Sequence, residues 1–190
     1  GDKPAFFRGD LIEAVLSPRP EFKSIQGRWL RNWKSGGKPD PLPAIPETGA
    51  PAPWFAAYLA LEAAATPVRG GERARSLLAR AERHAGTEPA AWAVLSWAWR
   101  MHGDFRRGAG DAIRARTLDP GRLEWTLAAA EALEQSGELD LADAYLMDAQ
   151  ESHPADARVL EARAAFFARQ GSPRAQIFYE AAQAARRGRL

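Results

Sequence analysis

Residues 88–120 read EPAAWAVLSWAWRMHGDFRRGAGDAIRARTLDP. Within this stretch Trp92, Leu95 and Trp99 recur at the spacing of one face of an α-helix. Gly103 favours the left-handed conformation that ends a helix, and Pro120 disfavours helical backbone in the residue before it. The stretch therefore predicts two consecutive helices that fold back on each other as a hairpin.

The same pattern returns along the chain with a period of 34 residues. Alanines keep this step at positions 81, 115 and 149, glycines at 103, 137 and 171, and prolines at 120 and 154. Positions 74, 108 and 142 all hold small residues, which lets paired helices approach closely. The period predicts four copies, at about 54–88, 89–122, 123–156 and 157–187.

This pattern resembles the tetratricopeptide repeat (TPR), a 34-residue helical hairpin with a tryptophan, a leucine and small residues at fixed positions. The second copy matches it through Trp92, Leu95, Ser96, Trp99, Gly108, Ala112 and Pro120. Departures from the family pattern are Thr126 in place of the first aromatic, TPVRGG at 66–71, and Gly86 in place of a proline. The resemblance implies an all-α fold, a right-handed superhelical stack of antiparallel helix hairpins (a TPR-like α-solenoid).

The two ends of the chain depart from the repeat. Residues 1–38 predict an N-terminal extension with short helices, residues 39–53 predict a Pro-rich linker, and residues 54–190 predict the TPR-like repeats. We expect the extension to dock on the repeats or on a partner. The last copy lacks a polar capping helix, so Phe166, Ile177 or Phe178 would be exposed for self-association, unless the terminal arginines suffice as a cap.

In the resembling family, the first helices of the hairpins line a concave groove. Trp92 and Trp99 are predicted to be core residues, and Trp92→Ala is expected to cost about 3–5 kcal/mol. Trp97 lies off that face, and the sequence leaves open whether it anchors a partner or packs on the N-terminal segment. The predicted partner-binding groove comprises Ala93, Trp97, Arg100, Met101, Leu127, Glu131, Glu134, Gln135, Glu161 and Arg169.

Charge is unevenly distributed along the chain. Residues 123–156 carry nine acidic side chains and no lysine or arginine, whereas residues 157–190 carry seven arginines and two acids. The acidic third copy would favour a basic partner segment, or would pair with the basic copies beside it. Each exposed ion pair contributes about 0–1 kcal/mol.

The sequence gives no sign of reaction chemistry. It has no cysteine, and its three histidines lack the spacing of metal ligands. His102 and His153 are instead predicted at helix C-termini. We expect no catalytic residues, no metal, no cofactor and no small-molecule substrate.

A binding function is therefore the main expectation. The resemblance implies a protein-interaction scaffold that holds a peptide or subunit in its groove, within a bacterial assembly such as one of the envelope or of secretion. Two alternatives are an accessory domain of an enzyme whose catalytic part lies elsewhere, and nucleic-acid binding through the basic copies. The acidic block interrupts the basic surface, so no nucleic-acid partner is expected.

The composition suggests a bacterial source. No apolar run approaches the roughly 18–20 residues that span a bilayer, so we expect a soluble protein. The chain opens with GDKPAFF, and a removed signal peptide or lipid anchor would leave no trace in it. The compartment, cytoplasm or periplasm, is left open.

Overall fold

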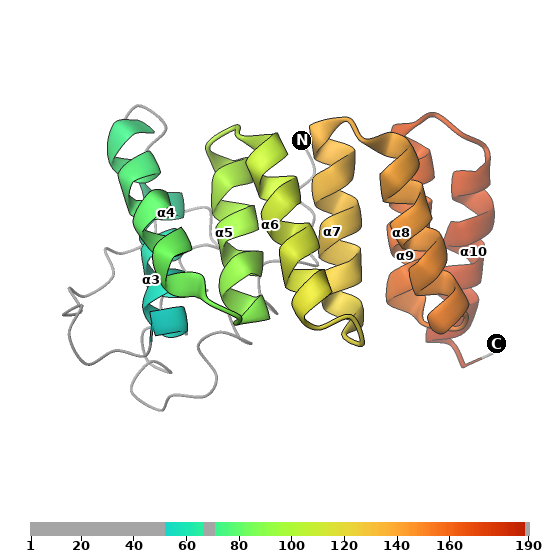
Figure 1. Ribbon diagram of the computed structural model, residues 1–190. Helices are drawn as coiled ribbons and strands as arrows, with labels where there is room; N and C mark the ends of the chain where they lie inside the picture. Colours follow the sequence, from blue (N-terminus) through green and yellow to red (C-terminus); the bar gives the residue numbers. More distant parts are fainter. Residues whose placement is uncertain (1–51, 67–70, 189–190) are drawn as a thin grey trace. The chain divides into compact units, whose positions relative to one another are not determined.

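The computed structural model describes residues 52–66 and 71–188 (Figure 1). Every regular element in these two ranges is an α-helix, and there are eight of them. They are α3 (Ala52–Ala65), α4 (Gly71–Ala85), α5 (Pro89–Met101), α6 (Phe105–Leu118), α7 (Leu123–Ser136), α8 (Leu139–Ser152), α9 (Ala157–Arg169) and α10 (Arg174–Arg186). The predicted extension (1–38) and nearly all of the predicted linker (39–53) lie outside the described residues, and the domain boundaries stay predictions.

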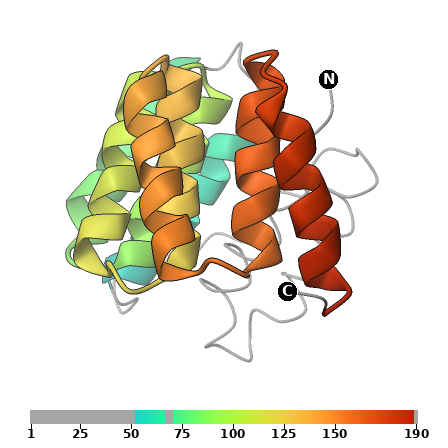
Figure 2. The same cartoon turned by 90° about the vertical axis from the view of Figure 1, so that its right-hand side faces the viewer.

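The helices fall into two compact units, one of α3 to α6, which ends at residue 118, and one of α7 to α10, which begins at residue 119. In the first unit α3 packs on α4, α5 packs on α6, and α5 also contacts both α3 and α4. In the second unit α7 packs on α8, α9 packs on α10, and α9 also contacts both α7 and α8. Figure 2 shows α9 and α10 as an antiparallel pair of neighbouring helices. The predicted all-α class built from helix hairpins is confirmed.

The turn inside each of the last three hairpins contains the glycine that the period predicts. Gly103, Gly137 and Gly171 have φ angles of 82°, 90° and 66°, all in the left-handed region. A side chain with a Cβ adopts this conformation only at a cost, so glycine suits the position. Likewise α6 ends two residues before Pro120 and α8 ends two residues before Pro154. These helix ends are confirmed as predicted.

Tryptophans form the core of the first unit. Trp92, Leu95 and Trp99 have exposed fractions of 5%, 0% and 1%, which confirms the predicted core face of α5. Both indole nitrogens have partners, because Trp92 Nε1 donates to the carbonyl oxygen of Gly86 at 2.9 Å and Trp99 Nε1 donates to Glu82 Oε1 at 3.2 Å. Two large rings are therefore buried without leaving a polar atom unsatisfied.

Two arginines of α6 place their guanidinium groups over the rings of the core tryptophans. The Arg114 guanidinium carbon lies 3.9 Å from the centre of the Trp92 ring, and that of Arg107 lies 4.7 Å from the centre of the Trp99 ring. A cation over an aromatic face gains electrostatic attraction from the ring.

The core of the second unit includes a tryptophan that the repeat pattern does not place there. Trp125 is 1% exposed, and its Nε1 donates to Asp119 Oδ2 at 3.2 Å. Thr126, which stands at the family's aromatic position, is also buried. The large buried side chain of α7 therefore stands one residue before the family's aromatic position.

The last hairpin exposes only part of the apolar surface expected from the missing cap. Phe166 is buried and Phe178 is half-buried, stacked on Phe167 with ring centres 5.4 Å apart. Ile177, in contrast, is 66% exposed. The uncovered surface is thus centred on Ile177.

The approach of α5 and α6 is closest at Gly108. A Cβ at this position would lie 2.5 Å from Arg100 Cγ and 2.9 Å from the carbonyl oxygen of Ser96. Gly110, on the same helix, has no atom within 4 Å of the corresponding point. Small residues at position 108 and its equivalents therefore set the spacing of the hairpin, as the sequence predicts.

This difference gives a matched pair of substitutions. Gly110→Ala should stabilise the protein by up to about 1 kcal/mol, because alanine favours helix more than glycine does. Gly108→Ala should be less stable than Gly110→Ala by about 1–3 kcal/mol, the usual cost of overpacking. Urea denaturation followed by circular dichroism measures both. Equal stability of the two variants would contradict the close approach at Gly108.

Candidate interaction surface

Three of the four groove residues predicted on α5 are buried. Ala93, Trp97 and Arg100 have exposed fractions of 2%, 7% and 8%, whereas Met101, the last residue of the helix, is 39% exposed. Burial of α5 extends over all its sides from Ala90 to Arg100, so Trp97 is covered although it lies off the face of Trp92 and Trp99. Partner binding by these residues stays a prediction, and Met101 is the member of the set that solvent already reaches.

The predicted residues of the second unit are largely engaged with one another. Leu127 is buried, and Gln135 Nε2 donates to Glu131 Oε1 at 3.1 Å along α7. Glu134 of α7 accepts a hydrogen bond from Arg169 Nε of α9 at 2.6 Å.

A second ion pair in this unit joins α9 to α10. Glu161 of α9 pairs with Arg186 of α10. This pair lies within the fourth copy, whereas the pair of Glu134 with Arg169 joins the acidic third copy to the basic fourth copy, which is one of the two outcomes that the charge pattern left open.

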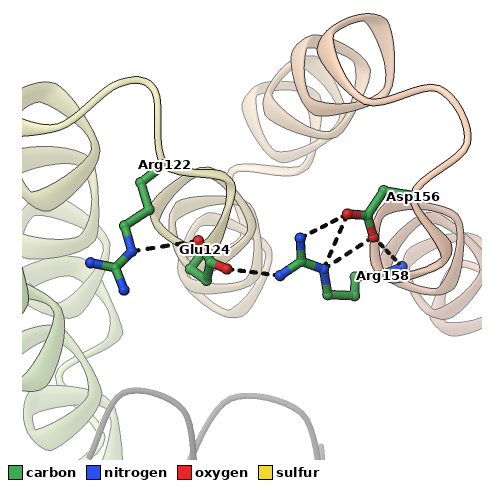
Figure 3. A network of polar contacts seen from close by, with 4 residues as sticks. All are labelled: Arg122, Glu124, Asp156 and Arg158. Atoms are coloured by element: carbon green, nitrogen blue, oxygen red, sulfur yellow. Dashed lines mark hydrogen bonds and ion pairs between the residues drawn. The ribbon is translucent and has the colours of Figure 1, made fainter. Parts of the chain in front are cut away.

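A further network of ion pairs lies at the start of α7 and α9 (Figure 3). Arg158 Nη1 donates to Glu124 Oε1 at 2.7 Å, and Arg158 Nη2 donates to Asp156 Oδ2 at the same distance. Arg122 Nε lies 3.6 Å from Glu124 Oε2 at the other side of that carboxylate. Asp156 also caps α9, since its Oδ1 accepts from the backbone N–H of Arg158 at 2.8 Å. The network fixes the first turn of α9 against that of α7.

These contacts shift the acid strength of the carboxyl groups. Hydrogen bonds from the Arg158 side chain lower the pKa of Asp156. Burial raises the pKa of Glu124, but the hydrogen bonds from its backbone and from Arg158 outweigh that effect, so its pKa is also lowered. Both carboxylates therefore stabilise the fold above their ordinary pKa values and lose this contribution in stronger acid.

Arg163 connects three helices of the second unit. Its Nη2 donates to Asp143 Oδ1 of α8 at 3.3 Å, and its guanidinium carbon lies 4.6 Å from the centre of the Phe178 ring of α10. Burial lowers the pKa of Arg163. No motif singled out this residue, because its role depends on the reach of a long side chain across two neighbouring helices.

One carboxyl oxygen in the first unit is buried without a hydrogen bond. Asp111 Oδ2, on α6, has no hydrogen-bond partner among the residues that the structure describes. Burial and the nearby Glu82 carboxylate raise the pKa of Asp111 from 3.8 to about 7, and the attraction of Arg114 and Arg107 offsets only part of this. Asp111 is thus partly protonated near neutral pH, which the sequence did not indicate.

Among residues 52–66 and 71–188, no group of three or more histidine, aspartate or glutamate side chains is arranged to hold a metal ion. In the same ranges no helix combines the length and the apolar character that crossing a membrane requires. The surface of the described residues does include large apolar side chains, of which Met101 on α5 and Ile177 on α10 are examples.

Comparison with known proteins supports the fold. No protein-family model matches this sequence, and no curated protein matches it. A solved structure named MamA MSR-1 C2 is similar to the chain, with a TM-score of 0.57 and 14% sequence identity over 97% of each chain. MamA is a TPR-containing protein, so the likeness confirms a TPR-like, all-helical fold.

Proposed function

We propose that this chain is a protein-interaction scaffold, which binds a peptide or a subunit of a bacterial multiprotein assembly. The observation that supports this proposal is the exposed Met101, which belongs to the predicted groove and lies at the end of a helix in a TPR-like hairpin. Methionine is flexible and polarisable, which suits contact with a partner surface.

The polar members of the predicted groove would contribute specificity rather than most of the affinity. Arg169 keeps 54% of its side chain exposed while it pairs with Glu134, and Gln135 is also exposed. A partner with a carboxylate could compete for Arg169, and one with a basic group could compete for Glu134. Such exchanges of ion pairs change the free energy of binding little, but they disfavour a partner with the wrong charge.

Self-association is a second part of the proposal. The exposed Ile177 on α10 supports it, because the last hairpin leaves this apolar side chain in solvent. Burial of one isoleucine contributes about 1.5–3 kcal/mol, which adds to other contacts but forms no stable interface alone.

The substitution Met101→Lys tests the scaffold function. Lysine near the C-terminus of α5 is compatible with the helix dipole, so the fold should be retained. We expect a protein captured from cells of the source organism to bind Met101→Lys about tenfold more weakly than the unmodified chain, because a charge replaces an apolar contact. Quantitative mass spectrometry of the retained proteins, followed by titration of the purified partner, measures the loss.

Leu118→Lys is the matched control. Leu118 is 37% exposed and ends α6 just as Met101 ends α5, so the chemical change and the helix position are similar. A partner lost with Met101→Lys and retained by Leu118→Lys supports binding at the predicted surface. Retention by both variants would contradict a role for Met101, and capture of no protein at all would contradict the scaffold function.

A further inference from the structure

The outward face of α8 combines apolar and acidic side chains. Ala142, Leu146 and Ala149 form the buried side of this helix. On the opposite side Leu141 and Met147 are 43% and 46% exposed. This outward face, from Asp140 to Glu151, is called the α8 face below, and its members are Asp140, Leu141, Ala144, Met147 and Glu151.

The acids at the two ends of the α8 face have no ion-pair partner among the described residues. Asp143, which points toward α9, pairs with Arg163. Asp140 near the start of α8 and Glu151 near its end have no ion pair with any residue in 52–66 or 71–188. The face thus has an apolar centre with an uncompensated negative charge at each end.

The outward side of α10 has the opposite charges in a similar arrangement. Ile177, 66% exposed, shares one helical face with Ala181 and Ala184. Arg174 begins the helix and Arg187 immediately follows it, and neither has an ion pair among the described residues, although the Arg174 guanidinium carbon lies 5.6 Å from the centre of the Phe167 ring of α9. This surface is called the α10 face. Glu180 is exposed on the same side of the helix between Ile177 and Arg187, where it accepts a hydrogen bond from Gln176 at 2.7 Å, so the face holds two arginines and one acid.

The two faces also match in length. At a rise of about 1.5 Å per residue, Asp140 to Glu151 spans about 17 Å and Arg174 to Arg187 spans about 20 Å. In an antiparallel arrangement Arg174 would approach Glu151 and Arg187 would approach Asp140, with the apolar side chains between them. A parallel arrangement would pair opposite charges at the ends equally well. It would, however, point the two helix dipoles in the same direction, which is less favourable than the antiparallel arrangement.

We infer that the α8 face of one copy binds the α10 face of a second copy, with the two helices antiparallel. This inference rests on the self-association included in the proposed function and supplies the surface that receives Ile177. Because the two faces differ, a single such contact leaves one face of each kind free to bind a further copy, and the contact can also be made twice between the same two copies.

Charge reversal tests this pairing in the full chain. One variant carries Asp140→Arg with Glu151→Arg, and the other carries Arg174→Glu with Arg187→Glu. Sedimentation velocity at low ionic strength should show that the unmodified chain grows in mass with concentration. Each variant alone should associate at least about tenfold more weakly, because like charges then meet at both ends of the contact.

Mixing the two variants gives the decisive measurement. In an equal mixture every contact can again join opposite charges, so we expect association to return to the level of the unmodified chain. Arg75→Glu with Arg106→Glu, two exposed arginines of α4 and α6, gives the same change in net charge as the α10 variant and should leave association unchanged. Circular dichroism confirms that each variant is folded.

Three results would overturn the inference. They are an unmodified chain that is monomeric at every concentration, a reversed variant that associates as strongly as the unmodified chain, and a mixture that does not recover. The scaffold function is tested separately, by capture of another protein and by its loss in Met101→Lys. We expect Met101→Lys to leave sedimentation unchanged, so either proposal can fail without the other.

Discussion

Trp99→Ala should lower the free energy of unfolding by about 3–5 kcal/mol, as is typical for a fully buried aromatic residue. Trp99 is 1% exposed in the centre of the first unit. Its removal would leave a cavity beneath Arg107 and would take from Glu82 Oε1 the hydrogen bond donated by the indole nitrogen. Urea denaturation followed by circular dichroism measures the loss.

Two controls separate packing from the hydrogen bond. Trp99→Phe keeps an aromatic ring but no N–H group, so it should lose less stability than Trp99→Ala. Met101→Ala, on the same helix but 39% exposed, should change stability by no more than about 0.5 kcal/mol. A Trp99→Ala variant that loses less than about 1 kcal/mol would show that the first unit does not depend on this tryptophan.

Asp111→Asn should stabilise the protein at neutral and alkaline pH. The pKa of Asp111 is about 7 in the folded protein, above its ordinary value of 3.8, so the folded state binds the proton more tightly than the unfolded chain does. The stabilisation of the folded state that comes from this tighter proton binding is complete below pH 3.8 and is lost as the pH rises through about 7. At 1.36 kcal/mol per pKa unit, the charged form costs about 4 kcal/mol at pH 8.

Stability measured between pH 4 and pH 8 tests this expectation. The unmodified chain should become less stable than Asp111→Asn as the pH rises, with most of the difference developing between pH 4 and pH 7. Glu72→Gln, which removes an exposed carboxyl group of α4, should follow the unmodified chain to within about 0.5 kcal/mol. Parallel pH profiles for the unmodified chain and Asp111→Asn would show that Asp111 is not buried as the structure indicates.

The sequence predicts the backbone well because the repeat fixes local conformation at recurring positions. Gly103, Gly137 and Gly171 end their helices in the left-handed region, and Trp92 and Trp99 occupy the core. Each of these features depends on a single residue type or on the period of one helix. Such signals can be read from one chain without knowledge of neighbouring helices.

Features that depend on side chains meeting across helices could not be predicted in the same way. Trp125 is buried although it stands one residue from the repeat position, because the rotation of α7 decides which residue faces inward. Asp111 is affected by Glu82 of α4, a residue 29 positions earlier, and Arg163 reaches both α8 and α10. Trp97 is 7% exposed, but the sequence alone does not show which neighbouring side chains bury it.

The bond between Glu124 and Arg158 joins residues that are 34 positions apart, and so the same place in two consecutive copies. Two identical copies could not contain this bond, because the same residue would then stand at both positions. The third and fourth copies are therefore complementary at this position. Duplicating the third copy in place would set two acids against each other, so growth of the array by whole units would be opposed at this junction.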